Sequence, residues 1–289
     1  MIPESIYTSL RVASKELAGC TEEQKNIALQ AVANSLELQT DTILKANSID
    51  VDREKQKGTK ASLIDRLSLS KERMLSIINS LNSIIAQPSP VGQIINGWTT
   101  PKGLKIEQVR VPIGVTAIIY ESRPNVTIDA FALAYKSGNA ILLRGSSSAI
   151  ESNKAIVAAI KKGLSSYQNS NNSCIGIPEA LELAPSLNHE EVDEIVTARG
   201  KIDLVLPRGS KRLIQTVLDK ARVPVIETGS GICHLYIDET ADIDSAVKIA
   251  ENAKLQRPGV CNAIETVLVH KNTIATFIPA LVECFAGRA

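Results

Sequence analysis

A cysteine on a Pro-Gly turn near the C-terminal end is the residue best suited to chemistry. Cys261 follows Gln256-Arg257-Pro258-Gly259-Val260 and precedes the apolar run Thr266 to Val269, which predicts a buried strand. A thiol on such a turn can face a cleft, and its thiolate is the best nucleophile among side chains. The alternative is that Cys261 is a small buried hydrophobic residue, as free cysteines usually are.

Four short apolar runs alternate with predicted helices through the middle of the chain, as buried parallel strands do: Val115 to Tyr120, Ala140 to Leu143, Ile202 to Leu206 and Val223 to Ile226. Repeated strand–helix units predict a parallel sheet with helices on both faces. Ligands of such sheets bind at the carboxyl ends of the strands. The expected binding edge therefore consists of the loops Glu121–Asn125, Arg144–Ser148, Pro207–Ser210 and Glu227–Gly231.

Before these units, the sequence predicts a helical layer, made of Ile6 to Gln39, Thr40 to Lys57 and Ser70 to Gln87. Thr21 and Gln24 have the spacing of a capping box, and Gly138 is placed to end the helix Val126 to Lys136. The mixed charges from Asp52 to Lys57 indicate a solvated helix face or loop. Lys105 to Val111 predicts a strand that is polar on one face, and Ser165 to Ser173 predicts a polar loop.

The composition excludes several classes of protein. The 289 residues carry a net charge of +1 and only 3% aromatic residues, which argues against a nucleic-acid partner or a membrane surface. The sequence has no signal-peptide layout and no apolar run long enough to span a bilayer. The five cysteines are widely spaced and form no CxxC pair, which argues against a disulfide framework and a zinc site and suits a reducing cytoplasm.

The usual phosphate-binding sequences, GxGxxG and the Walker motif, are absent. Pro207-Arg208-Gly209-Ser210 instead lies between a predicted strand and a predicted helix, whose N-terminus would offer free N–H groups to a phosphate. A plain strand-to-helix turn is the alternative interpretation.

Four segments resemble the gamma-glutamyl phosphate reductases (glutamate-5-semialdehyde dehydrogenases), a branch of the aldehyde dehydrogenase superfamily: Val111 to Val115, Tyr120 to Thr127, Leu143 to Ser146 and Gln256 to Asn262. The resemblance implies an α/β fold, with a helical layer and a Rossmann-type dinucleotide-binding domain in residues 1–228 and the beginning of a second α/β catalytic domain in 229–289. It also implies NADPH-dependent reduction of L-glutamyl 5-phosphate to glutamate 5-semialdehyde in proline biosynthesis, with release of phosphate.

The resemblance assigns roles to individual residues. Cys261 matches the nucleophile that forms a thioester, and Asn125 matches the oxyanion-hole asparagine, although a helix N-cap is an alternative for Asn125. Glu227 occupies the position of the base that activates water in hydrolytic aldehyde dehydrogenases. An enzyme that releases phosphate needs no such water, so Glu227 is expected either to deprotonate Cys261 or to shape the loop in which Glu227 itself lies. The cofactor-binding candidates are Arg144, suited to a 2′-phosphate unless it is merely a solvated cation, and Ser146, Gly209 and Ser210.

The family pattern continues beyond the last residue of this sequence, so the chain is expected to be C-terminally truncated. Lys102 to Val111 would then be one arm of an oligomerisation hairpin whose partners lie in the missing part, and a full-length protein would be a homo-oligomer. The resemblance further suggests coupling to glutamate 5-kinase and a cytoplasmic location. Two alternatives remain, namely a hydrolytic aldehyde dehydrogenase that uses Glu227 and a non-catalytic nucleotide-binding fragment.

Overall fold

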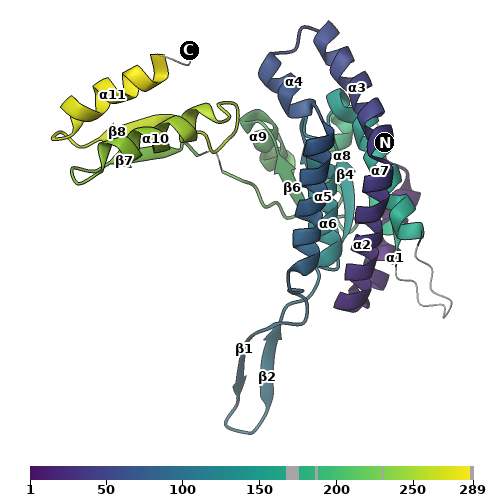
Figure 1. The fold of residues 1–289 in the computed structure, drawn as a ribbon. Coiled ribbons are helices and arrows are strands. Elements are labelled where there is room, and N and C mark those ends of the chain that lie inside the picture. Colours follow the sequence, from purple (N-terminus) through teal and green to yellow (C-terminus); the bar gives the residue numbers. More distant parts are fainter. Residues whose placement is uncertain (167–175, 186–187, 230, 287–289) are drawn as a thin grey trace. The chain divides into compact units, whose positions relative to one another are not determined.

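The computed structural model describes residues 1–166, 176–185, 188–229 and 231–286, so most of the loop expected at Ser165 to Ser173 lies outside the described residues. The chain divides into two compact units, Met1–Thr228 and Gly229–Ala289. Unit 1 contains the helical layer and the four-stranded sheet (Figure 1). Unit 2 contains Cys261.

The sheet of unit 1 has four parallel strands in the order β5-β4-β3-β6: β5 (Leu181–Leu183), β4 (Ala140–Arg144), β3 (Val115–Tyr120) and β6 (Leu204–Arg208). All six residues of β3 are buried, because it lies between β4 and β6 with helices over both faces. This burial explains its continuous apolar sequence. The α/β fold with a parallel sheet, expected from the sequence, is confirmed.

Two strand predictions need correction. The strand expected at Ile202 to Leu206 begins and ends two residues later, at Leu204 and Arg208. Pro207 and Arg208 therefore belong to β6 and not to the following loop. Val223 to Ile226 forms only an isolated bridge, between Val225 and Val205. Pro224 has no backbone N–H and contributes only its carbonyl, which accepts from Val205 N, so the pairing cannot extend as a regular ladder.

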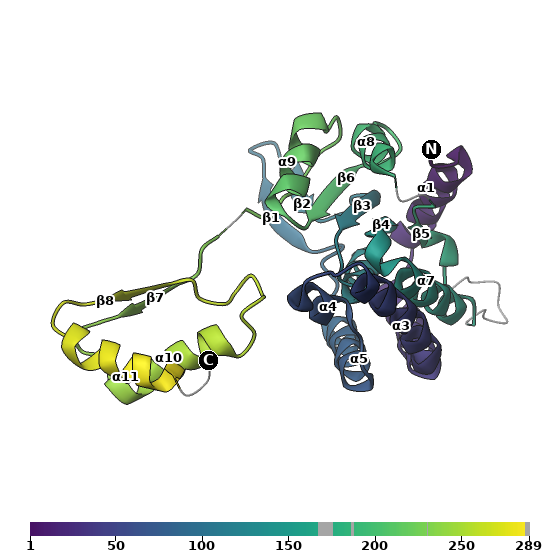
Figure 2. The same ribbon diagram turned by 90° about the horizontal axis from the view of Figure 1, so that it is seen from above.

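Helices cover both faces of this sheet (Figure 2). One face carries α6 (Asn125–Lys136) and α7 (Ile150–Ser165), with α2 (Glu22–Leu38), α3 (Thr40–Gln56) and α5 (Lys71–Ala86) packed outside them. The short helix α4 (Ala61–Leu67) packs on α3. The other face carries α1 (Glu4–Ala18), α8 (His189–Thr197) and α9 (Lys211–Lys220). The helices predicted from periodicity are confirmed within a few residues at their ends.

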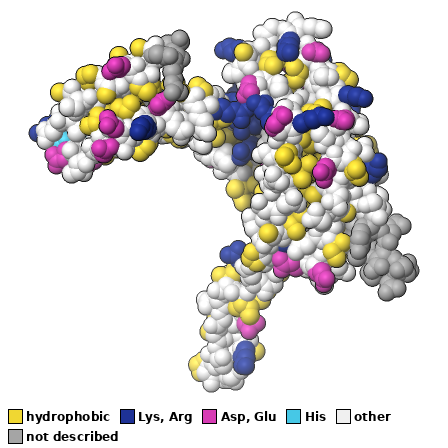
Figure 3. Space-filling model, in the orientation of Figure 1, with side chains coloured by type: hydrophobic (Ala, Val, Ile, Leu, Met, Phe, Trp, Pro, Cys, Tyr) yellow, Lys and Arg dark blue, Asp and Glu magenta, His cyan; other side chains and the backbone are white. Residues whose placement is uncertain are grey.

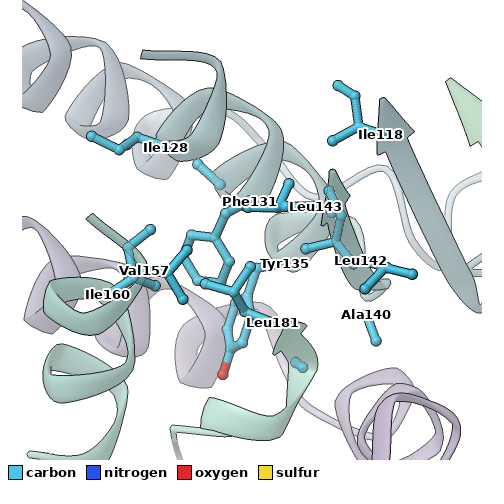
Figure 4. Packing of buried hydrophobic residues seen from close by; sticks show 14 of the residues in the cluster. Ile118, Ile128, Phe131, Tyr135, Ala140, Leu142, Leu143, Val157, Ile160 and Leu181 are labelled. Atoms are coloured by element: carbon cyan, nitrogen blue, oxygen red, sulfur yellow. The ribbon is translucent and has the colours of Figure 1, made fainter. Parts of the chain in front are cut away.

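The core of unit 1 is mainly aliphatic, with one aromatic pair between α6 and the sheet. Phe131 and Tyr135 lie 5.3 Å apart between ring centroids and pack against Leu142, Leu143 and Ile160 (Figure 4). Tyr135 is fully buried, and its hydroxyl accepts a hydrogen bond from Ile177 N. Burial of one such side chain contributes about 1.5–3 kcal/mol, so this layer fixes α6 on the sheet.

Both predicted helix-end signals are confirmed. Thr21 accepts from Gln24 N and Gln24 accepts from Thr21 N, which completes the capping box of α2. Gly138 has a φ of 78°, and the N–H groups of Gly138 and Asn139 close the end of α6 on Tyr135 and Ala134. The solvated face predicted from Asp52 to Lys57 is wrong at Glu54, which is buried and whose carboxylate accepts hydrogen bonds from Lys57 and Thr59.

The expected hairpin arm pairs with a neighbouring segment that precedes it. Strand β2 (Lys105–Val109) is antiparallel to β1 (Ile94–Thr99), and Gly103, with a φ of 85°, lies in the turn between them. The expectation that Lys102 to Val111 forms one arm of a hairpin is therefore confirmed, with β1 as the other arm. The sequence did not predict β1, whose six residues are all exposed.

Unit 2 is a strand–helix–strand unit with one further helix. Strands β7 (His234–Ile237) and β8 (Thr266–Val269) are parallel, and α10 (Ile243–Leu255) connects them before α11 (Ile274–Ala286). Ile237, Ala250 and Phe277 form the centre of its core. β8 is the strand predicted after Cys261, but it is only half-buried, because within this unit it belongs to a sheet of two strands.

Candidate active site

Three of the four expected loops start at the same edge of the unit 1 sheet. Ile119 pairs with Arg144 and Tyr120 with Arg208, so β3, β4 and β6 end side by side. The segment before Glu227 runs beside β6, since Ile226 N donates to Val205 O, and Glu227 itself is exposed. The structure therefore brings the strand-end loops together, as expected for a ligand-binding edge.

The N-terminus of α7, which follows the Arg144–Ser148 loop, is closed by a buried carboxylate from α3. Asp50 is completely buried, and its Oδ2 accepts from Ser152 N at 2.8 Å and from Ser152 Oγ at 2.7 Å. Its Oδ1 accepts from Glu151 N and Arg53, and Arg53 also donates to Ser147 O. Because Asp50 satisfies these first N–H groups, this helix end is not open to a phosphate.

The N-terminus of α9 differs from that of α7, because the residues around it, Glu121, Gly209 and Ser210, are exposed. Ser210 is its N-cap and accepts from Leu213 N. Ser210 N and Ser210 Oγ donate to the two carboxylate oxygens of Glu121, at 2.9 and 2.8 Å. A Cβ on Gly209 would lie 2.7 Å from Glu121 Cδ, so the absence of a side chain permits this close approach. The carboxylate of Glu121 thus occupies this helix end. The same donors suit the negative oxygen atoms of a dinucleotide phosphate.

Positive charge surrounds the same helix end. Arg208, Lys211 and Arg212 are exposed and flank Gly209 and Ser210 in the sequence. Figure 3 shows Lys and Arg side chains gathered over the part of unit 1 where α9 lies. Together with the helix dipole, these cations favour a negatively charged ligand.

Arg144 is half-buried, so its interpretation as a solvated cation is wrong. Its Nη2 donates to Asn188 O at 3.3 Å, at the start of α8. Burial lowers the pKa of Arg144, and the negative charge of Glu191 opposes that shift.

Ser146 is tied into the turn that starts α7. Its Oγ accepts from Ser148 N at 3.2 Å and lies 2.8 Å from Ser148 Oγ, which also contacts Ser122 Oγ at 2.7 Å. Gly145 is required beside it, because an added Cβ would lie 2.2 Å from Asn153 Nδ2. The loop that carries Arg144 and Ser146 is therefore held in one shape.

Asn125 lies in the first turn of α6, and its predicted role as N-cap is wrong. The helix begins at Asn125, with Pro124 before it and no side-chain cap. Asn125 Nδ2 instead donates to Asp129 Oδ2 at 3.1 Å, one turn further along. Burial raises the pKa of Asp129, while the Asn125 bond and the charge of Arg208 lower it.

In unit 2, Cys261 is an exposed free thiol, so its interpretation as a buried hydrophobic residue is wrong. Its turn is held by Val260 N on Arg257 O and Ala263 N on Val260 O, both at 3.3 Å. Cys233, just before β7, also supports it: Cys233 Sγ donates to Cys261 O at 3.4 Å, and Cys233 O accepts from Glu265 N. An exposed thiol on a tethered turn is suited to nucleophilic attack.

The model of the Aldehyde dehydrogenase family matches residues 9–287. The chain belongs to the aldehyde dehydrogenase family. Its resemblance to the gamma-glutamyl phosphate reductases is also confirmed: the chain is 46% identical to the Kosmotoga olearia protein of that name over 275 residues, and 48% identical to the Cutibacterium acnes protein over 278 residues. These alignments cover 95% and 96% of the chain.

The chain spans 65% of the length of both these curated relatives. A crystal structure of gamma-glutamyl phosphate reductase from Thermotoga maritima is 42% identical, with a TM-score of 0.86, and the match covers 98% of this chain and 67% of that one. A probable aldehyde dehydrogenase from Listeria monocytogenes matches with a TM-score of 0.71 at 18% identity, covering 97% of this chain and 57% of that one, which supports the fold alone.

As in other members of the aldehyde dehydrogenase family, the expected cofactor is a nicotinamide nucleotide. Across the described ranges, no three His, Cys, Asp or Glu side chains are grouped so that they could hold a metal ion. None of the helices in the described part of the chain is long and apolar enough to cross a membrane.

Sequence reasoning missed four polar residues of this aldehyde dehydrogenase chain: Asp50, Glu121, Asp129 and Cys233. Asp129 was detectable in principle, because residues four apart on a helix face each other and Asn125 was already a candidate. Glu121 lay in an expected loop, but only the structure pairs it with Ser210. Asp50 and Cys233 carried no local signal, since their partners are 102 and 28 residues away.

Proposed function

We propose that this chain carries the nucleotide-binding and nucleophile-bearing parts of a gamma-glutamyl phosphate reductase, which reduces L-glutamyl 5-phosphate to glutamate 5-semialdehyde with NADPH in proline biosynthesis. The exposed Cys261 thiol on its tethered turn is the observation that carries this proposal. The names of the relatives at 46–48% identity support the choice of substrate.

Cys261 supplies the covalent chemistry. Its thiolate attacks the acyl carbon of L-glutamyl 5-phosphate, so that a carbon–sulfur bond forms and the carbonyl oxygen becomes an oxyanion. Collapse of this intermediate breaks the bond to the phosphate oxygen, releases phosphate and leaves a thioester on Cys261. After reduction of the thioester to a thiohemiacetal, the carbon–sulfur bond breaks, the aldehyde departs and the thiolate is restored.

Asn125 is the proposed oxyanion-hole donor, through its side-chain NH₂. One N–H of the Asn125 amide is engaged by Asp129, and the other remains to donate. Removal of one oxyanion-hole donor typically costs about 2.7–4 kcal/mol of barrier. Glu227 deprotonates Cys261 or shapes its loop; a reaction that ends in phosphate release needs no water-activating base.

The cofactor binds at the strand-end edge of unit 1. The Ser210 N–H and hydroxyl, beside Gly209, hold the diphosphate, while Arg144 and Ser146 hold the ribose end with its 2′-phosphate. When bound, NADPH supplies the hydride that the thioester requires. We assign unit 1 to the dinucleotide-binding domain, and unit 2, which carries Cys261, to the catalytic domain.

The same proposal covers the setting of the enzyme. An acyl phosphate is labile and must come from a kinase that phosphorylates glutamate, so we expect functional coupling to glutamate 5-kinase. We also propose a cytoplasmic location and, for the full-length protein, a homo-oligomer.

The test is phosphate-dependent oxidation of glutamate 5-semialdehyde, measured as NADPH formation from NADP by this chain. The proposal predicts a rate that requires phosphate and that Cys261→Ala abolishes. Phosphate-independent formation of glutamate identifies a hydrolytic dehydrogenase that uses Glu227 as base. Binding of NADPH without any turnover identifies a non-catalytic nucleotide-binding protein.

A further inference from the structure

The carboxylate of Glu121 occupies the place where a phosphate group would bind at α9. Both of its oxygens are used: Oε2 accepts from Ser210 N at 2.9 Å and Oε1 accepts from Ser210 Oγ at 2.8 Å. These two donors are the ones that the proposed function assigns to the dinucleotide phosphates. Ser210 N has one hydrogen, so the carboxylate and a phosphate cannot both accept a full hydrogen bond from it.

The contact is built to allow close approach of an anion. Glu121 Cδ lies 2.7 Å from the position of a Cβ at Gly209, so any residue other than glycine there would push the carboxylate away. Among the residues that the structure describes, Glu121 makes no ion pair within 4.0 Å with a Lys or Arg side chain. The helix end itself therefore holds this carboxylate, as it would hold a phosphate.

Glu121 differs in one decisive respect from the carboxylate that closes α7. Asp50 is completely buried and bridges α3 to α7 through Ser152, so its removal would leave buried donors unpaired. Glu121 and Ser210 are both exposed, and water can replace either partner. The first carboxylate is a fixed structural cap, whereas the second can be displaced by a ligand.

We propose that Glu121 is an internal competitor for the phosphate-binding end of α9 and thereby sets the affinity of the chain for its dinucleotide cofactor. The inference rests on the proposed function, because it takes Ser210 as a phosphate donor. Binding of the cofactor moves the Glu121 side chain off Ser210, and the Arg208, Lys211 and Arg212 charges remain to neutralise the phosphates.

The test is the dissociation constant of NADPH for Glu121→Gln, measured by calorimetry on the whole chain. Loss of the competing charge is expected to tighten binding about two- to five-fold, as for a charge at a helix end. Glu121→Ala should tighten binding as well, which keeps the test valid if Glu121→Gln alone folds poorly. Glu107→Gln, an exposed glutamate on β2, changes the net charge equally and should leave NADPH affinity unchanged.

Adenosine, which has no phosphate, separates competition at α9 from a general change in the site. Its affinity should be the same for wild type and Glu121→Gln, and an equal gain for adenosine would overturn the inference. If wild type binds NADPH and both Glu121 variants bind it equally or more weakly, Glu121 does not compete and the inference alone fails. If neither wild type nor variants bind NADPH, the proposed function fails together with the inference.

Discussion

Asn125 and Asp129 are joined by a hydrogen bond of 3.1 Å from Asn125 Nδ2 to Asp129 Oδ2, one turn apart on α6. The bond orients the Asn125 amide and places a partly buried carboxylate next to the proposed oxyanion donor. Burial is the largest cause that raises the pKa of Asp129, and the bond from Asn125 and the charge of Arg208 only partly offset it. The ionised carboxylate of Asp129 therefore carries a folding cost at neutral pH.

Asp129→Asn should stabilise the chain at neutral pH. The folded-state pKa of Asp129 lies above its unfolded value, so the ionised carboxylate costs folding free energy once the pH exceeds the folded pKa. Below the unfolded pKa of about 3.9 the group is protonated in both states, and the advantage of the variant should vanish. Urea unfolding across this pH range measures the effect. A variant less stable than wild type at neutral pH would show that the carboxylate is net stabilising.

Asp50→Ala should destabilise unit 1 by about 2–4 kcal/mol, because it leaves Ser152 N, Ser152 Oγ and Arg53 without their buried acceptor. Asp52→Ala, two residues along the same helix but exposed, is the matched control and should change stability by less than about 0.5 kcal/mol. Denaturant midpoints of the two variants give the comparison. Equal effects would mean that Asp50 is not the cap of α7.

Gly138→Ala should cost more stability than Gly58→Ala, although both glycines follow a helix end with nearly the same φ, 78° and 72°. The left-handed backbone alone costs an alanine about 1–2 kcal/mol. At Gly138 an added Cβ would also lie 2.8 Å from Pro112 Cγ, while nothing lies within 4 Å at Gly58. Thermal unfolding of both variants separates strain from collision, and a larger loss at Gly58 would contradict the packing at Pro112.

Arg144→Ala should weaken binding of NADPH by about tenfold and binding of NADH far less, because a charge-assisted pair with the 2′-phosphate is lost only for NADPH. Arg222→Ala, an exposed arginine beyond the C-terminal end of α9, serves as the control and should affect neither cofactor. Dissociation constants for both nucleotides are the measurement. An equal loss for NADPH and NADH would remove Arg144 from 2′-phosphate recognition.

The elements that carry the strand-end edge of the site could be predicted because their signals are local. The apolar run of β3, the Gly138 helix end and the Thr21–Gln24 capping box each depend on residues close in sequence. Two strands were predicted wrongly. Val223 to Ile226 has strand composition, but Pro224 limits its pairing with β6, and β1 was missed because its exposed residues lack an alternating pattern.

In the candidate site, too, local motifs could be recognised in the sequence, whereas contacts between distant residues could not. Cys261, Asn125, Arg144 and Ser210 could be named from motifs, whereas their hydrogen-bond partners could not. Glu121 reaches Ser210 across 89 residues, and Cys233 reaches Cys261 across 28. Such contacts depend on the register of β3 against β6, and on that of β7 against β8, which a single sequence does not contain.

The most direct test of the central claim is peptide mass spectrometry of the chain after mixing with L-glutamyl 5-phosphate in the absence of NADPH. Without reductant the thioester should accumulate, so we predict a glutamyl adduct on the peptide that contains Cys261, removable by hydroxylamine and absent from Cys261→Ala. Cys233, whose thiol lies against the Cys261 carbonyl, is the internal control and should stay unmodified. No adduct on Cys261, or an adduct on Cys233 instead, would contradict the role of Cys261 as the nucleophile.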